Sequence, residues 1–259
     1  GIVRGHPRLL TRSTEKDTSV QWSWRVVTVL GLHIRLHVSL VLLPAWAAFH
    51  WGHFARGGLS AALFGVLLSL MLLASVAVHE MAHGLQARYL GMRVRDVTLL
   101  PIGGLTRIDM PNEPAHELLV ALAGPAANIA AAVALAALAL FFTIDLPSTF
   151  SQFVQLLRVP GPVSLLLYGL CANLVLGFAN LLPVLPLDGG RALHAALSLG
   201  PLRAAAELLT MRAGQGCAAA FALGGLLFHN PWLSLLSLPL WIGASLTGRF
   251  EQWEPEPPA

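Results

Sequence analysis

Charge is scarce in this 259-residue chain: Asp, Glu, Lys and Arg together make up 11% of it, whereas 56% is hydrophobic. A soluble domain carries roughly a quarter of its residues as charges. Residues 61–78 and 118–142 contain no formal charge at all. This shortage excludes a soluble enzyme, a nucleic-acid binder and a disordered tail as the main interpretation, and it indicates an integral membrane protein.

Cysteine motifs, basic blocks and internal repeats are also missing. The two cysteines, Cys171 and Cys217, lie among apolar residues and form no C-x-x-C pattern, so they say nothing about redox compartment or metal. The 16 Lys and Arg residues never form a block, so the net charge of +3 does not indicate a nucleic-acid partner. The lack of a repeat argues against a carrier built from two matching halves.

Six stretches are apolar enough to be transmembrane helices. They are residues 36–51, 59–90, 117–144, 163–185, 203–228 and 231–247. The first half of the fifth stretch is amphipathic because it contains Glu207, Arg212 and Gln215. The predicted fold class is an all-α polytopic membrane protein with about six transmembrane helices and one small membrane-associated β-hairpin.

The distribution of positive charge predicts the orientation, because Lys and Arg accumulate in cytoplasmic loops. With the N-terminus inside, only Arg56 and Arg158 of the 16 Lys and Arg fall on the outer side. We therefore expect a cytoplasmic N-terminal segment at residues 1–30, a membrane domain at 31–248 and a cytoplasmic tail at 249–259. The polar N-terminal stretch has no apolar run before a small-residue cleavage site, so no signal peptide is expected.

The expected β-hairpin lies at about residues 92–109, between the second and third candidate helices. This stretch contains β-branched residues followed by the turn residues Pro101, Gly103 and Gly104. It would lie at the cytoplasmic face or dip into it. Non-helical backbone at that depth is tolerated only where protein buries it or where it lines a wet cavity.

The second candidate helix contains His79-Glu80-Met81-Ala82-His83. At 100° per residue the two imidazoles lie within about 40° of one another and one turn apart, which suits two nitrogen ligands of one Zn²⁺. Glu80 is offset by one position, where it can exchange protons with a reacting water. The pattern alone has a roughly 2% chance of arising in this composition. However, such polar groups inside a membrane helix are costly unless paired or wet, which indicates function.

A catalytic zinc site needs a third protein ligand and one open position. Asp188 is the candidate, because it follows two prolines that end the fourth helix and precedes two glycines that free the backbone. The alternative is a turn aspartate that caps the following helix. The residues alone do not separate these two interpretations.

Together, these motifs resemble the site-2 protease family of intramembrane zinc metalloproteases. The shared elements are, in chain order, His79-Glu80-x-x-His83, Gly124-Pro125-Ala126-Ala127-Asn128, and the stretch from Asn180 to Leu187-Asp188-Gly189. The Pro101-Ile102-Gly103-Gly104 turn also resembles the membrane-embedded β-loop of that family, and the likeness covers residues 31–248. The resemblance implies that Asp188 is the third zinc ligand.

The same resemblance implies a setting and partners. We expect an integral protein of a prokaryotic plasma membrane, with its active site nearer the cytoplasmic side and with membrane proteins as substrates. Some relatives carry PDZ or CBS domains, and this chain contains neither. The regulation that those domains provide is then absent, supplied by a separate regulatory protein, or located beyond this chain.

The roles of three asparagines and one histidine can be interpreted in more than one way. Asn128 and Asn180 could hold the substrate backbone or polarise its carbonyl, or they could join helices through hydrogen bonds. Asn173 is interpreted as joining helices. His194, six residues after Asp188, could support the zinc ligands, although a position unrelated to the site is the simpler interpretation.

The predicted activity is hydrolysis of a peptide bond within or next to a transmembrane segment, with Glu80 as general base and then acid beside the zinc ion. A helix hides its carbonyls in hydrogen bonds, so the substrate must unwind, and it could then add as a strand beside Gly103 and Gly104. The rivals are a zinc carrier, an inactive homologue and a haem-binding helix pair. A carrier has no use for Glu80, and a haem protein leaves both Glu80 and Asp188 unexplained.

Overall fold

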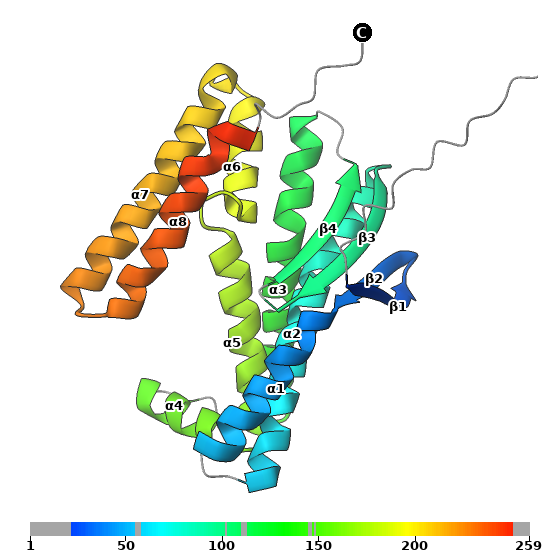
Figure 1. Ribbon diagram of the computed structural model, residues 1–259, viewed down its shortest axis with the longest axis vertical. Coiled ribbons are helices and arrows are strands. Elements are labelled where there is room, and N and C mark those ends of the chain that lie inside the picture. The colour runs from blue at the N-terminus through cyan, green and yellow to red at the C-terminus, as the bar shows by residue number, and fades with distance from the viewer. Residues whose placement is uncertain are drawn as a thin grey trace, which may run out of the picture.

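The structure is a computed structural model that describes residues 22–54, 58–101, 103–109, 113–144, 147 and 149–250. These residues form eight α-helices and one four-stranded sheet. In Figure 1 the long helices α2, α3 and α5 form the centre, with the α7–α8 pair on one side and the sheet on the other. The fold is therefore mostly helical. The predicted all-α class with one β-hairpin was wrong in one respect, because the sheet has four strands.

Three helices in the described part of the chain are long and apolar enough to cross a membrane: α2 (Gly58–Tyr89), α3 (Pro114–Phe141) and α5 (Pro162–Asn180). They confirm the second, third and fourth predicted stretches. Both α3 and α5 begin with a proline, which suits the first turn because the missing N–H has no helical partner there. The fourth stretch ends earlier than predicted, since a prolyl turn follows Asn180.

The remaining long helices are α7 (Ala206–Leu227) and α8 (Pro231–Phe250), which form a helical hairpin as predicted. The first predicted helix is shorter than residues 36–51: α1 covers Leu42–Phe49, between a 3₁₀ turn and a π-helical turn. Two short helices, α4 (Phe150–Arg158) and α6 (Asp188–Ser198), were not predicted. Neither is long enough to give the signal of a membrane span.

The sheet has the order β1-β2-β3-β4, from β1 (Ser23–Val29), β2 (Leu32–His37), β3 (Arg93–Leu100) and β4 (Gly103–Asp109). The β3–β4 pair is antiparallel and confirms the predicted hairpin. The β1–β2 hairpin was missed, and β2 pairs in parallel with β3. The missed signal is the alternation of apolar and polar residues across β2, which is the period of a strand.

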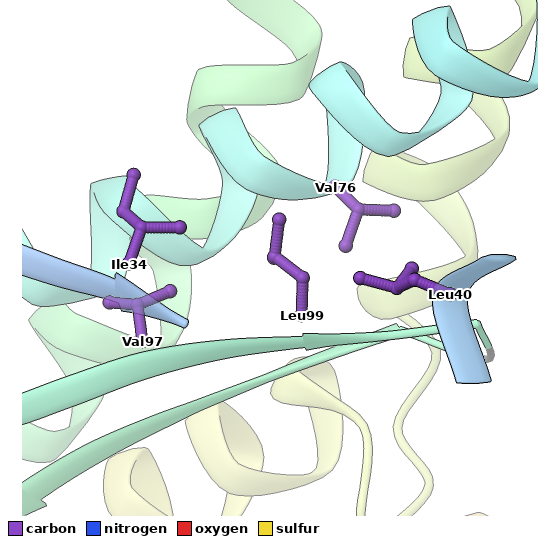
Figure 2. Close-up of a cluster of buried hydrophobic side chains, with 5 residues drawn as sticks. All are labelled: Ile34, Leu40, Val76, Val97 and Leu99. Carbon is purple, nitrogen blue, oxygen red and sulfur yellow. The ribbon is translucent and has the colours of Figure 1, made fainter. Parts of the chain in front are cut away.

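A cluster of buried apolar side chains fixes the sheet against α2. Figure 2 shows Leu99 of β3 between the sheet and Val76 of α2, with Leu40 on one side. Val97 of β3 and Ile34 of β2 lie next to each other on the other side. Val97 and Leu99 point the same way because alternate strand residues share a face. Val76 lies one turn before His79, so this core fixes the sheet next to the motif-bearing turn of α2.

Candidate metal centre

The helical spacing of α2 places the two histidines of the motif together in the protein interior. His79 and His83 are buried, and their Nε2 atoms lie 3.1 Å apart. The rings meet edge to face, with centroids separated by 4.7 Å. Two imidazole nitrogens therefore point at one location, as the four-residue spacing predicts.

Asp188, the first residue of α6, reaches the same location from more than a hundred positions along the chain. Its Oδ2 atom lies 3.0 Å from His79 Nε2 and 3.2 Å from His83 Nε2. The turn between α5 and α6 holds it there, with Val184 only 1% exposed. The Asp188 side chain thus faces the histidine pair, which is the position that a third ligand would take.

The three side chains fit a zinc ion. Two nitrogens and a carboxylate oxygen are a donor set that Zn²⁺ binds. In a tetrahedral site with zinc–ligand distances of 2.0–2.1 Å, two ligand atoms lie roughly 3.4 Å from each other. The three observed separations, 3.0, 3.1 and 3.2 Å, are close to that value. In the described part of the chain, His79, His83 and Asp188 form one group of possible metal ligands, with all ligand atoms within 4.8 Å.

Gly124 of α3 keeps the space beside the two rings open. A Cβ atom at this position would lie 2.3 Å from His83 Nε2 and 2.7 Å from His79 Nε2. Both distances are far below an ordinary contact, so no side chain fits between α3 and the rings. This glycine belongs to the Gly124–Asn128 motif, whose role the spacing along the sequence did not reveal.

Hydrogen bonds fix the orientation of both imidazoles. His83 Nδ1 lies 2.7 Å from the carbonyl oxygen of Val120, which can only accept, so Nδ1 carries the hydrogen. His79 Nδ1 lies 2.6 Å from Asn128 Oδ1 and donates to it. In the neutral form of each ring the lone pair is then on Nε2, which is the nitrogen that faces Asp188.

The amide of Asn128 is itself fixed by a buried network across α2, α3 and α5. Its Nδ2 donates to the Ser75 carbonyl oxygen at 3.2 Å and to Asn173 Oδ1 at 2.7 Å. Asn173 Nδ2 in turn donates to Ser75 Oγ at 3.0 Å and to the Gly169 carbonyl oxygen at 2.8 Å. Both amide nitrogens thus face acceptors, so neither amide can be reversed without losing these bonds.

A cavity of about 490 Å³ opens beside the three candidate ligands. Its polar wall includes Glu80, whose Oε2 accepts a hydrogen bond from Thr106 Oγ1 of β4 at 2.7 Å. The wall is formed by residues of α2, β4, α5 and α6 together with Pro186 and Leu187: Val76, His79, Glu80, His83, Gly103, Gly104, Leu105, Thr106, Ile108, Leu176, Asn180, Pro186, Leu187, Asp188 and Arg191. The base candidate, the ligand candidates and the hairpin thus share one space.

The other residues singled out in the sequence divide between this cavity and the protein interior. Gly103, Gly104 and Asn180 line the cavity, and Asn180 Nδ2 also donates to the Leu176 carbonyl oxygen at 2.9 Å. Asn128 lies behind His79 with no exposed surface. His194 is not among the residues that line the cavity in the described part of the chain.

Sequence reasoning missed two polar residues of the cavity, Thr106 and Arg191. Arg191 Nη1 lies 3.7 Å from Asp188 Oδ1, and its Nε lies 3.7 Å from Glu117 Oε1 of α3. The spacing of three residues from Asp188 at a helix start could have indicated this pair. No comparable signal marks Thr106, because its contact with Glu80 joins residues 26 positions apart.

Comparison with known proteins agrees with this geometry. The model of peptidase family M50 matches residues 67–221, a stretch that contains all three candidate ligands and Glu80. The chain belongs to peptidase family M50. This family assignment confirms the likeness to site-2 proteases and makes the chain a member of a zinc metalloprotease family.

Individual relatives support the assignment. The chain is 30% identical over 239 residues to a zinc metalloprotease of Methanocaldococcus jannaschii. The aligned region covers 91% of this chain and 63% of that protein. It is 34% identical over 166 residues to stage IV sporulation protein FB of Bacillus subtilis, covering 63% of this chain and 48% of the relative. This M50 chain therefore spans about half to just under two thirds of these curated relatives.

Among solved structures, the fold matches the site-2 protease from Methanocaldococcus jannaschii with a TM-score of 0.57 and 29% sequence identity. The match covers 92% of this chain and 99% of the other. The M50 chain therefore shares the arrangement of a solved site-2 protease over nearly its whole length.

Proposed function

We propose that this chain is an intramembrane zinc metalloprotease, which hydrolyses a peptide bond within or next to a transmembrane segment of a membrane-protein substrate. The observation that carries the proposal is the convergence of two buried imidazoles and a carboxylate beside Glu80, on a helix long and apolar enough to span a membrane. Membership of the M50 family supports the same activity.

His79, His83 and Asp188 would hold the zinc ion. A zinc ion in such a site lowers the pKa of a water molecule and polarises a carbonyl. The protein contributes the orientation: Asn128 and the Val120 carbonyl fix the two rings from behind. Asn128 is fully buried behind His79, and its amide bonds His79, Ser75 and Asn173, so its proposed role is to orient His79.

Glu80 is the proposed general base and acid. It lines the cavity one position from the first ligand, and Thr106 holds one of its carboxylate oxygens. The carboxylate would take the proton of the attacking water and then deliver it to the leaving amine. Asn180 lines the same cavity, where its amide could hold the substrate backbone or support the carbonyl that becomes negatively charged.

Strand β4 offers a binding position for an unwound substrate. It pairs with β3 on one side and is the last strand of the sheet in the described residues. Gly103 and Gly104, at its start, line the cavity. An extended substrate could add to this edge and recover the hydrogen bonds that its helix gives up, while its scissile bond lies near Glu80.

The proposed membrane domain covers residues 31–248, between the cytoplasmic segments 1–30 and 249–259. The short α1, together with α7 and α8, would complete six spans around α2, α3 and α5. We propose a prokaryotic plasma membrane, with both termini in the cytoplasm and the active site nearer that side. The partners would be the lipid bilayer, membrane-protein substrates and a separate regulatory protein.

The test is purified protein incubated with a panel of single-pass membrane proteins, with Glu80→Gln and a chelator as controls. Wild-type protein should cleave at least one substrate, and both controls should abolish cleavage. Zinc content should remain near that of the wild type in Glu80→Gln, because Glu80 is not a ligand candidate. Cleavage that survives the Glu80 change would refute the catalytic assignment, and a zinc-loaded wild type without activity would favour an inactive homologue.

A further inference from the structure

Strand β4 contacts the side chain of Glu80 at two positions on the same face. The Thr106 hydroxyl lies 2.7 Å from Glu80 Oε2 and 3.1 Å from the Glu80 carbonyl oxygen. Two residues earlier on the strand, a Cβ atom at Gly104 would lie 2.2 Å from Glu80 Cγ. Glu80 therefore packs directly against β4, where it contacts the hydroxyl of Thr106 and the backbone of Gly104, which has no side chain.

We propose that Thr106 is a positioning residue that orients the Glu80 carboxylate. This inference rests on the proposed function, since it concerns the base of that reaction. A hydroxyl has one hydrogen to donate, and the shorter contact is the one to the carboxylate, where a charge-assisted bond is stronger. Without that donor, the carboxylate would be free to sample other directions.

The rest of the structure holds the Thr106 hydroxyl in place. Thr106 pairs directly with Val97 of β3, and Val97 is fully buried in the cluster that fixes the sheet on α2. Threonine is also branched at Cβ, so few χ1 rotamers are open to it.

Two variants separate the hydroxyl from the shape of the side chain. Thr106→Val keeps the branched shape and removes the donor, whereas Thr106→Ser keeps the donor. The matched control is Thr98→Val on β3, because the buried Thr98 Oγ1 has no hydrogen-bond partner in the described structure. The measurements are kcat and KM on a cleaved substrate, and zinc content.

We expect kcat to fall about tenfold or more in Thr106→Val, with KM and zinc content unchanged, which is the range for loss of a hydrogen bond to a charged group. Thr106→Ser should recover most of the rate, and Thr98→Val should match the wild type. A wild-type kcat in Thr106→Val would overturn the inference. So would an equal loss in the valine and serine variants, because packing and not the hydroxyl would then be responsible.

A second measurement does not depend on turnover. A double-mutant cycle of Thr106→Val and Glu80→Ala, read as the apparent melting temperature, should show that the two changes are not additive. If the wild-type chain cleaves nothing, the proposed function fails, and the cycle still decides whether the hydroxyl and the Glu80 side chain interact. Additive shifts would overturn the inference independently of activity.

Discussion

Replacing Gly124 by alanine gives the most direct test of the metal centre, because it adds one methyl group beside both imidazoles. The new Cβ would lie 2.3 Å from His83 Nε2 and 2.7 Å from His79 Nε2. Ordinary contacts begin at about 3.4 Å, so the His83 ring and α3 must move apart by roughly 1 Å. Ligand distances at zinc tolerate only about 0.2 Å.

The expected magnitude follows from that displacement. Loss of a group that merely supports a ligand lowers metal affinity by about 10- to 100-fold. Moving the ligand itself by several times the tolerance should cost at least about 100-fold in zinc affinity. The substitution should at the same time favour the helix by up to about 1 kcal/mol, because alanine replaces glycine in a helix interior. This gain in helix propensity does not restore the ligand geometry, because the methyl group still displaces the His83 ring.

The assay is zinc content after purification, together with competition against a chromophoric zinc chelator. Gly216→Ala is the matched control, because Gly216 also lies inside a helix but has open space where its Cβ would be. This control should bind zinc with wild-type affinity. One tightly bound zinc per chain in Gly124→Ala would refute the reasoning, since the ion could then not lie between the two rings next to α3.

Three further predictions follow from the same contacts. Asn128→Leu should lower zinc affinity about 10- to 100-fold, measured by the same competition, because His79 loses the acceptor that orients it; unchanged affinity would mean that the network only joins helices. Gly104→Ala should abolish cleavage while zinc content stays normal, since its methyl group displaces Glu80; active Gly104→Ala would contradict the close contact. Removal of zinc by a chelator should lower the apparent melting temperature of the wild type, and the shift should be much smaller in Asp188→Asn, because only the intact ligand set gains stability from the metal.

The long apolar helices and the histidine pair could be predicted from the sequence because both depend on local periodicity. An apolar run of about thirty residues predicts α2 to within one residue at each end. Within that helix, the positions of His79 and His83 then follow from 3.6 residues per turn alone. Features of this kind need no knowledge of what packs against the helix.

The sheet and the third ligand depend on contacts between distant segments, which local patterns do not specify. Strand β2 pairs with β3 across about sixty residues, and the pairing is visible only when both strands pack on α2. Asp188 could be named from its prolines and glycines, but a capping role fitted equally well until the fold brought it to the histidines. Thr106 could not be found at all, because a threonine in a strand is ordinary.

The hydrogen bonds around the site lead to one physical conclusion about the three ligand atoms. Each Nδ1 donates its hydrogen, one to Asn128 and the other to the Val120 carbonyl, so in neutral imidazoles, the form that binds a metal, both Nε2 atoms are acceptors. An ionised Asp188 Oδ2 is also an acceptor, and it lies within 3.2 Å of each nitrogen. In that protonation state three acceptors cannot satisfy one another, and burying them unpaired inside a membrane protein is costly. A cation held among them satisfies all three at once, which is why the surrounding network is better explained by metal binding than by helix association.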